Sequence, residues 1–303
     1  MTDDQAHRRA GLWLGLGAYG LWGVLPLYFK ALVHVPSTEI VAHRILWSLV
    51  FLGVLVSVSR RWSTIRTAVT TPRLMLTLTA SALLIAINWL IYIWAVISGH
   101  VLEGSLGYYL NPLINVLLGV VLLKERLSLA QKLAVALAGA GVAVLAVGAG
   151  SGIWISLSLA VSFGIYGFLR KVAPVDSLEG LSIETAILAP VALGWVLWLQ
   201  NSGEGGWGNW GWGTDVLLIV AGAVTAVPLL LFAAAAKRLP YSTLGFLQYV
   251  APTIQFALAV LLFGERLTLA HIICFGAIWT ALAIFAGDGL RMARNRSLAA
   301  RQA

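Results

Sequence analysis

The chain has 303 residues, of which 60% are hydrophobic and only 11% are charged, with a mean hydropathy of +0.90 and a formal net charge of +8. A soluble globular protein could not bury this much apolar surface, so the composition excludes that class and predicts an integral membrane protein. The single cysteine, Cys274, excludes a disulfide framework and a cysteine-based metal site.

Apolar stretches of about 20 residues, the length that crosses a ~30 Å hydrocarbon core as a helix, follow one another with short connections. Ten such stretches can be placed, so the predicted fold class is an all-α integral membrane protein with ten transmembrane helices. The predicted spans lie near residues 11–31, 38–58, 74–97, 102–122, 129–149, 152–169, 180–199, 214–236, 242–262 and 269–287.

One stretch of the sequence occurs twice. PLINVLLGVVLLKERLSLA, from Pro112 to Ala130, returns as PTIQFALAVLLFGERLTLA, from Pro252 to Ala270, at an offset of 140 residues. The second copy lies an odd number of predicted spans after the first, so it enters the membrane from the opposite side. The sequence therefore predicts two inverted five-helix repeats, residues 1–149 and 150–303, an arrangement typical of secondary transporters.

The basic residues indicate the orientation of the chain in the membrane. They gather on alternate connections, at residues 8–9, 60–73, 124–132, 170–171, 237–238 and 291–301, whereas the intervening connections carry only Lys30 and Arg266. By the positive-inside rule, both termini are predicted to be cytoplasmic. The positive charge is thus explained by topology, and no nucleic-acid partner is predicted, because the charges occupy short loops on one side.

Two ionisable residues lie inside predicted spans, Arg44 in span two and Glu184 in span seven. A charge at the centre of a membrane helix costs about 2.5–3.5 kcal/mol, so each is a functional candidate. They align at the offset of 140, as do Glu39 and Glu179. Two interpretations stay open: these residues gate or couple transport, or they are static ion pairs or snorkelling side chains that fix helix register.

The predicted depths argue against a direct Arg44–Glu184 ion pair. Arg44 lies roughly 10 Å inside the outer end of its helix, whereas Glu184 lies only about a turn inside the cytoplasmic end. Two separate clusters are predicted instead, and Glu184 is the predicted acid if transport is proton-coupled, because a buried carboxyl group can titrate near neutral pH. The predicted partners are Glu39 or Glu103 for Arg44, and Arg170 or Lys171 for Glu184.

Uncharged polar and aromatic side chains are the predicted substrate contacts. Asn88 and Tyr92 lie one turn apart on one helical face, with Trp89 beside them. Asn88 must face protein or cavity rather than lipid, and an interhelical hydrogen bond would satisfy it as well as a ligand would. The other candidates lie in the aromatic motifs GLWG (20–23) and GIYG (164–167) or near prolines inside spans: Trp22, Tyr166, Asn111, Gln248 and Gln255.

A glycine- and tryptophan-rich stretch, GEGGWGNWGWG, runs from Gly203 to Gly213 on the predicted outer side. Tryptophan is enriched where a membrane meets water. Trp207, Trp210 and Trp212 are therefore predicted to anchor this loop at the membrane interface rather than to form a sugar-binding platform.

Several runs along nearly the whole chain resemble one known family. They are AYGLWGVLPLYFK near the start, EIVAHRILWS in span two, NWLIYIWAVISGHVLEGSLGYYLNPLINVLLGVVLLKERL from Asn88 to Leu127, and YSTLGFLQYVAPTIQFALAVLLFGE in span nine. The sequence is similar to the RarD family of EamA-type drug/metabolite transporters. The resemblance implies a ten-helix permease of the inner, cytoplasmic membrane, in which spans one to four and six to nine surround a central cavity.

Together with the resemblance, these features predict a secondary active transporter that exports small amphipathic drugs or metabolites, such as chloramphenicol-like compounds or amino acids, by alternating access. No cofactor or metal is expected, and the chain is not expected to be an enzyme, because it carries no recognisable catalytic motif. A lipid or lipid-linked-precursor flippase and a non-enzymatic membrane partner stay open as alternatives. Spans five and ten carry no buried charge, and residues 138–150 of span five are dense in small residues. These two spans are expected to form a scaffold or, alternatively, a homodimer face.

Overall fold

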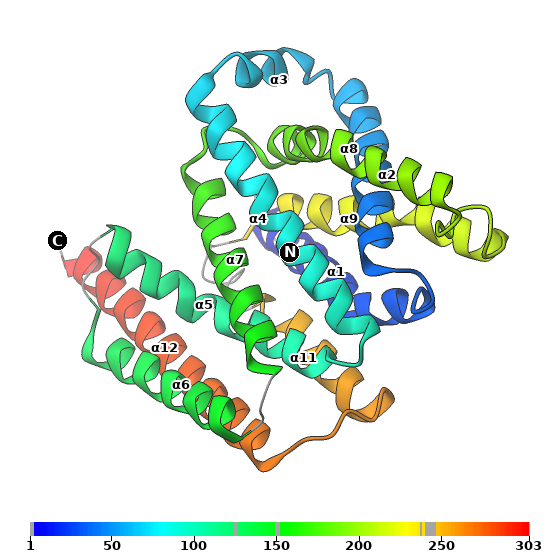
Figure 1. The fold of residues 1–303 in the computed structure, drawn as a ribbon. Coiled ribbons are helices and arrows are strands. Elements are labelled where there is room, and N and C mark those ends of the chain that lie inside the picture. The colour runs from blue at the N-terminus through cyan, green and yellow to red at the C-terminus, as the bar shows by residue number, and fades with distance from the viewer. Residues whose placement is uncertain (1–2, 124–126, 149–151, 237, 240–246, 303) are drawn as a thin grey trace.

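A computed structural model describes residues 3–123, 127–148, 152–236, 238–239 and 247–302. Within these ranges all regular secondary structure is helical (Figure 1). The elements are α1 (Asp3–Ala31), α2 (Ser37–Val58), α3 (Trp62–Val69), α4 (Pro72–Ile97), α5 (Val101–Leu123), α6 (Leu129–Gly148), α7 (Ile153–Val172), α8 (Ser177–Ser202), α9 (Trp212–Ala236), α11 (Val250–Ala257), the π-helix η2 (Leu258–Leu262) and α12 (Leu269–Gln302).

The predicted spans are recovered in part. Within the described chain, 7 helices are long and apolar enough to cross a membrane, and they belong to α1, α2, α4, α6, α7, α8 and α9. Two further apolar helices, Val250–Leu262 and Leu269–Ile284, are shorter. An all-helical chain with several candidate spans is therefore confirmed, whereas the count of ten and the inverted repeat stay predictions.

The ninth span, predicted at residues 242–262, is described only from residue 247, because residues 240–246 lie outside the described part. Its described helix α11 begins at Val250. Pro252 lies in the first turn of α11, where a residue that has no N–H to donate is tolerated. From Leu258 the helix widens into η2, a π-turn of a kind often found at functional sites.

An additional helix, α3, occupies the connection between α2 and α4, where no helix was predicted. Its Ala68 packs with Leu74 and Leu78 of α4 and with Ile183 of α8, while Trp62 stays 49% exposed. The helix is amphipathic and only 8 residues long. A search for long apolar stretches therefore could not detect it.

The two halves of the chain pack against each other through corresponding helices. Helix α1 contacts α9 and α11, while α7 contacts α4 and α5; α2 contacts α9, while α8 contacts α4. Three further pairs, α2 with α8, α5 with α11 and α6 with α12, join counterparts directly. Exchanging each helix in these pairs for its counterpart in the other half reproduces the same pairs. The halves also meet where α8 contacts α3 and where α12 contacts α5.

Helices α6 and α12 lie side by side at one edge of the molecule (Figure 1). A Cβ atom at Gly141 would lie 3.3 Å from the backbone of Cys274 and would collide with Ala277, so glycine permits this close approach. The small residues predicted here thus serve packing within the chain. A homodimer through these helices stays a prediction.

The loop between η2 and α12 caps a helix of the first half. The Glu265 carboxylate accepts hydrogen bonds from the backbone N–H groups of Val101 (2.8 Å) and Leu102 (2.7 Å) at the start of α5. The first N–H groups of a helix have no partner within it, and its N-terminus favours negative charge. Burial raises the pKa of the Glu265 carboxyl group, and these two hydrogen bonds oppose that shift.

Replacing Glu265 by glutamine is expected to lower the thermal unfolding midpoint of the detergent-purified protein. The amide keeps one acceptor oxygen but turns an N–H group toward the second backbone donor, and a hydrogen bond to a charged group contributes about 1.5–3 kcal/mol. Glu204→Gln is the matched control, because Glu204 is exposed and its replacement should leave the midpoint unchanged. Equal midpoints for Glu265→Gln and the unsubstituted protein would contradict the capping role.

Candidate functional site

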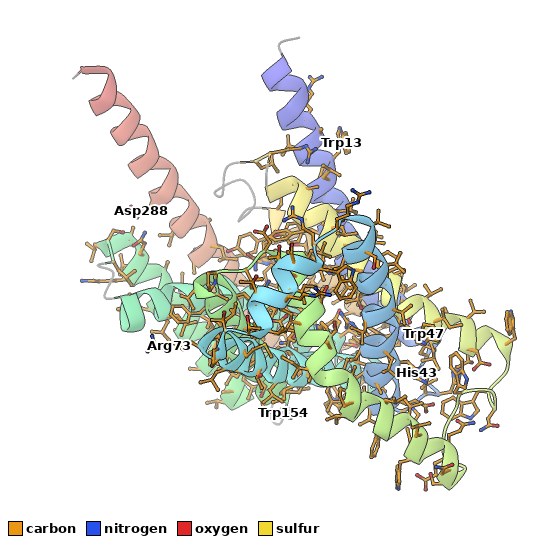
Figure 2. All side chains as sticks on the ribbon, turned by 90° about the horizontal axis from the view of Figure 1, so that it is seen from above. Trp13, His43, Trp47, Arg73, Trp154 and Asp288 are labelled. Carbon is orange, nitrogen blue, oxygen red and sulfur yellow. The ribbon has the colours of Figure 1, made fainter. Side chains whose placement is uncertain are left out.

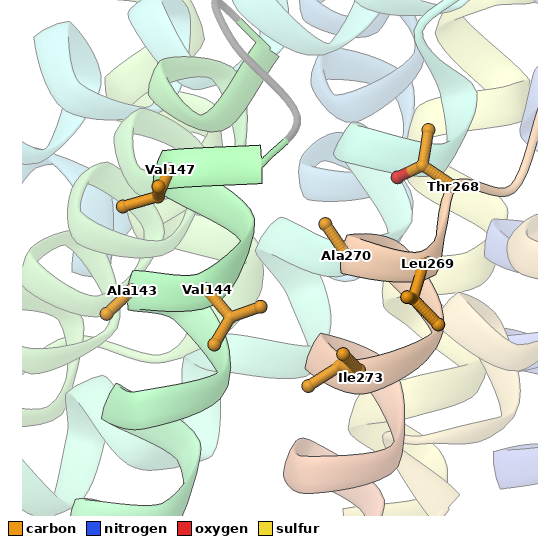
Figure 3. Close-up of a pocket in the computed structure, with 7 residues that line it drawn as sticks. All are labelled: Ala143, Val144, Val147, Thr268, Leu269, Ala270 and Ile273. Atoms are coloured by element: carbon orange, nitrogen blue, oxygen red, sulfur yellow. The ribbon is translucent and has the colours of Figure 1, made fainter.

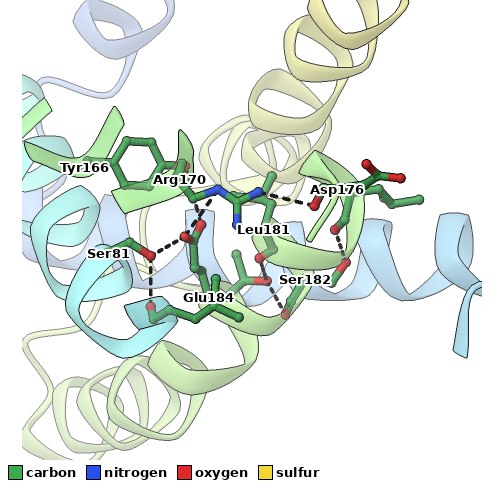
Figure 4. Close-up of polar contacts among 10 residues, drawn as sticks. Ser81, Tyr166, Arg170, Asp176, Leu181, Ser182 and Glu184 are labelled. Atoms are coloured by element: carbon green, nitrogen blue, oxygen red, sulfur yellow. Dashed lines mark hydrogen bonds and ion pairs between the residues drawn. The ribbon is translucent and has the colours of Figure 1, made fainter. Parts of the chain in front are cut away.

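A buried carboxylate is held by three helices (Figure 4). Glu184 of α8 is 0% exposed, and Ser81 of α4 donates a 2.5 Å hydrogen bond to its Oε1. Tyr166 of α7 donates to Oε2 at 3.4 Å, and the Arg170 Nε lies 3.7 Å from Oε1. The carboxylate therefore has a cationic partner and two hydroxyl donors, which together offset the cost of burying its charge.

The predicted Glu184–Arg170 pair is present in the structure. Arg170 follows Tyr166 by one turn of α7, so both side chains reach the same carboxylate. The Arg170 Nη2 also donates to the Asp176 carbonyl at 3.3 Å, while its buried Nη1 has no hydrogen-bond partner among the described residues. The side chain of the alternative partner, Lys171, lies outside the described part.

Glu184 lies deeper than predicted. Helix α8 begins at Ser177 rather than near residue 180, so Glu184 lies roughly 10 Å from that end. Arg44 lies equally far from the start of its own helix, because α2 begins at Ser37. The two charges thus lie at matching depths in corresponding helices.

The arginine of α2 is held by a different set of groups. Arg44 is 7% exposed, and its Nε donates a 2.8 Å hydrogen bond to the Thr225 hydroxyl of α9. Its guanidinium carbon lies 4.2 Å from the Trp89 ring centroid and 5.9 Å from that of Phe29. Both distances are within the range of cation–π attraction.

The prediction that Arg44 pairs with Glu39 or Glu103 is wrong. Glu39 accepts hydrogen bonds from the backbone N–H groups of Gly206 (2.9 Å) and Trp207 (3.3 Å), and Glu103 lies 3.6 Å from His100. Because a helix turns about 100° per residue, Glu39 and Arg44 point in directions roughly 140° apart around α2. Glu39 therefore faces the loop after α8, and Arg44 faces α9.

Arg44 and Glu184 form no ion pair with each other, as predicted, but a row of aromatic rings joins their clusters. The row begins beside Arg44 and ends at the hydroxyl that contacts Glu184. The rings are Phe29, Tyr92, Tyr108, Phe163 and Tyr166, with successive centroid distances of 6.1, 5.3, 5.9 and 5.9 Å. They come from α1, α4, α5 and α7, so both halves contribute.

The three candidates of α4 divide into two roles. Asn88 is 1% exposed and donates to the Leu159 carbonyl (3.1 Å) and the Ser162 hydroxyl (3.0 Å) of α7. Its Oδ1 accepts a 3.3 Å hydrogen bond from Tyr108. The geometry therefore supports an interhelical hydrogen-bonding role for Asn88. Trp89 and Tyr92, in contrast, lie beside the Arg44 cluster.

None of the remaining candidates is among the described partners of Arg44 or Glu184. Gln255 of α11 donates a 3.0 Å hydrogen bond to the Trp22 carbonyl of α1, and its Oε1 is buried without a hydrogen-bond partner among the described residues. The Oδ1 of Asn111 on α5 is in the same situation. Gln248, just before α11, is half-buried. Trp22 packs on Tyr19 and Phe232.

The glycine-rich loop is held partly inside the protein. Trp207 stacks on the buried His43 with a centroid distance of 4.9 Å and lies 5.9 Å from Trp47. The prediction of an interfacial anchor is therefore wrong for Trp207, whose backbone N–H and that of Gly206 meet Glu39. Trp212, at 79% exposure, remains free to meet the membrane interface.

Sequence reasoning missed Ser81 and Thr225, the hydroxyls that bind the two charges. Each lies in the half opposite to the charge it contacts: Ser81 of α4 binds Glu184, and Thr225 of α9 binds Arg44. Shifted by the repeat offset, Thr225 aligns one helical turn from Ser81. A search for hydroxyls at related places in spans three and eight could have found them.

A pocket opens on the outside of the molecule between α6 and α12 (Figure 3). Its lining is apolar apart from one hydroxyl group and includes none of the predicted site residues. It consists of Ala143, Val144, Val147, Thr268, Leu269, Ala270 and Ile273. This pocket therefore suits lipid chains rather than a polar solute, and the functional candidates are the two buried clusters.

Comparisons with known proteins agree on one family. The model of the EamA-like transporter family matches residues 9–147 and again residues 150–287. An uncharacterized transporter of Vibrio cholerae is 46% identical over 291 residues, covering 96% of each chain, and protein RarD of Escherichia coli K12 is 46% identical over 294 residues, covering 97% and 99%. A solved crystal structure at 21% identity covers 91% of this chain and 97% of its own with a TM-score of 0.56, which shows the shared fold alone.

Proposed function

The chain belongs to the EamA-like transporter family, and we propose that it is a secondary active transporter that exports small amphipathic drugs or metabolites across the cytoplasmic membrane. The observation that carries this proposal is the pair of buried, separate charge clusters around Arg44 and Glu184, one on each of the two matched halves. Buried ionisable groups in membrane helices mark solute or proton pathways.

The contacts of the two clusters suit alternating access. Arg44 of the first half binds Thr225 of the second, and Glu184 of the second half binds Ser81 of the first. A rocking motion of one half against the other would strain or break one of these hydrogen bonds while retaining the other. The aromatic row between the clusters would then line the path of the solute.

The predicted topology is supported by which loop ends meet. Arg61, after α2, lies 3.4 Å from Glu179 at the start of α8, whereas Glu39, at the start of α2, meets the loop after α8. Helices α2 and α8 thus run in opposite directions, as the charge pattern requires. The beginning of α1, near Trp13, and the end of α12, beyond Asp288, project from the same end of the molecule (Figure 2).

Cysteine labelling tests this topology. In intact cells, a membrane-impermeant maleimide is expected to label Glu204→Cys, in the outer loop, but to label Thr67→Cys, on α3, only after permeabilisation. Both positions are exposed, and the native Cys274 is buried, so background labelling should be low. Labelling of both positions from outside would contradict the proposed orientation.

Charge displacement on a solid-supported membrane tests transport itself. The purified protein is screened against amino acids, organic cations and chloramphenicol over a range of pH. A substrate-dependent current that varies with pH is expected, and Glu184→Gln should abolish the pH dependence, because an amide cannot carry a proton. Asp176→Asn is the control, since that side chain is 79% exposed and should leave the profile unchanged. An unaltered profile in Glu184→Gln would remove this residue from coupling.

The pocket between α6 and α12 gives little support to the alternative that the protein is a lipid flippase. A lipid-handling site requires polar groups for the headgroup beside an apolar channel for the chains. Thr268 is the only polar side chain in the lining of that pocket, and the residues of the two charge clusters do not contribute to it. The arrangement thus favours an enclosed solute path.

A further inference from the structure

Arg44 has no counter-charge among the described residues. Each acidic side chain that the structure describes is engaged or placed elsewhere. These are Glu39, Asp215 and Glu265 on backbone N–H groups, Glu103 on His100, Asp176 and Glu179 on Arg61, Glu184 on Arg170, Asp288 on Ser128, and Glu204, which is exposed in the outer loop. A guanidinium group keeps its charge in proteins. Burying an unpaired ion costs several kcal/mol, so a visiting anion would stabilise Arg44 strongly.

The guanidinium group still has hydrogen-bonding capacity. Only its Nε–H is used among the described residues, on Thr225. The two Nη groups keep their N–H donors in the planar fork that matches a carboxylate with two parallel hydrogen bonds. The ring of Tyr92 packs on Phe29, the same ring that faces Arg44, and the Tyr92 hydroxyl is buried and also lacks a hydrogen-bond partner in the described structure. These groups form an incomplete set that an anion would complete.

The surroundings select the rest of the ligand. Trp89 and Phe29 lie against the guanidinium group, and Tyr92 packs edge-on against Phe29 at 6.1 Å. Aromatic walls favour an apolar or aromatic body. A single positive charge is neutralised by a single negative charge, whereas a phosphate dianion would leave a net charge in a low-dielectric site.

We propose that Arg44 and the Tyr92 hydroxyl bind the carboxylate of an aromatic or otherwise apolar monocarboxylate, whose body lies against Trp89 and Phe29. This inference rests on the proposed transport function and names the chemical class of its solute. Thr225 positions Arg44 for this role by accepting the hydrogen bond of Nε–H, which leaves the Nη groups for the ligand.

Calorimetric titration of the full-length protein in detergent tests the proposal without requiring transport. The probes are 3-phenylpropionate, the uncharged 3-phenylpropionamide of nearly the same shape, and inorganic phosphate. The acid is expected to bind about tenfold or more tightly than the amide, since hydrogen bonds to charged groups contribute at this level. Inorganic phosphate should bind more weakly than the acid. Equal binding of acid and amide, or tighter binding of phosphate, would overturn the proposal.

Variants locate the site. Arg44→Gln should lose the preference for the acid over the amide. Tyr92→Phe should weaken binding of the acid while leaving binding of the amide unchanged. Arg73→Gln removes an exposed cation and should bind both probes as the unsubstituted protein does. Preference retained in a folded Arg44→Gln protein would refute the assignment. If Arg44→Gln does not fold, Arg44→Lys keeps the charge without the planar fork and should bind the acid more weakly.

The outcomes separate this inference from the proposed function. Acid binding at Arg44 without any substrate-dependent current would contradict electrogenic transport and leave the binding site intact. Conversely, currents carried by neutral or cationic solutes, with no preference for the acid, would support transport and refute the monocarboxylate assignment.

Discussion

Replacement of Arg170 by methionine is expected to destabilise the protein by about 3–5 kcal/mol, because it leaves Glu184 as a buried carboxylate without a cationic partner. Glu184 is fully buried, and Arg170 supplies the positive charge 3.7 Å from its Oε1. Ser81 and Tyr166 would remain as hydrogen-bond donors, but hydroxyl groups do not neutralise a charge. The loss is measured as the free energy of unfolding in mixed micelles.

A double-mutant cycle isolates the ion pair from the packing of Arg170. Adding Glu184→Gln to Arg170→Met removes the unpaired charge, so the double variant is expected to recover much of the lost stability. Arg73→Met, at an exposed position near the start of α4, is the matched control and should change stability by less than about 0.5 kcal/mol. If the second substitution recovers nothing, the stabilising role of the Glu184–Arg170 pair is refuted.

Substitution of Gly222 by alanine is expected to disrupt the contact between α2 and α9. A Cβ atom there would lie 2.5 Å from the backbone carbonyl group of Trp47 and 2.9 Å from the amide nitrogen of Ser48. These are backbone atoms of a neighbouring helix, so relief requires separation of the two helices. Overpacking in a well-packed core costs typically 1–3 kcal/mol, and the upper end, about 3 kcal/mol, is expected here.

Gly194→Ala is the matched control for Gly222→Ala. Gly194 lies inside α8, is exposed, and would place its Cβ in open space. Alanine there should be neutral or stabilise by up to about 1 kcal/mol, because glycine is a poor helix former. Gly222→Ala should therefore lower the thermal unfolding midpoint, whereas Gly194→Ala should leave it unchanged or raise it. A similar small shift in both would show that the close α2–α9 approach is not required.

Much of the architecture could be predicted from the sequence because long apolar spans and a repeated segment are large signals. The same signals fail for short or irregular elements. Helix α3 is amphipathic and only 8 residues long, and the described ninth span consists of α11 and η2 rather than one uninterrupted α-helix. Neither the short helix α3 nor the change from α11 to η2 can be predicted from the average hydropathy of a stretch of sequence.

The candidate site could be predicted less fully, because partners depend on helix orientation. The charge of Arg170 and its place near the cytoplasmic end predicted its pairing with Glu184. Their predicted place towards the outer side of the membrane suggested Glu39 or Glu103 for Arg44, but the different directions of Glu39 and Arg44 around α2 place Glu39 against the glycine-rich loop. Ser81 and Thr225 were missed because a single hydroxyl in an apolar helix gives no signal until the opposing helix is known.

The opposite signs of Arg44 and Glu184 bear on why both halves are carried by one polypeptide. Two identical copies of either half, assembled as a dimer, would place two arginines or two glutamates at these corresponding depths. Like charges in a low-dielectric interior repel each other, and neither copy could change without the other. Covalent fusion lets each half vary separately, so that one supplies the cation and the other the anion. The fused chain thereby fixes a one-to-one stoichiometry of buried positive and negative charge at these positions, which no assembly of identical subunits could provide.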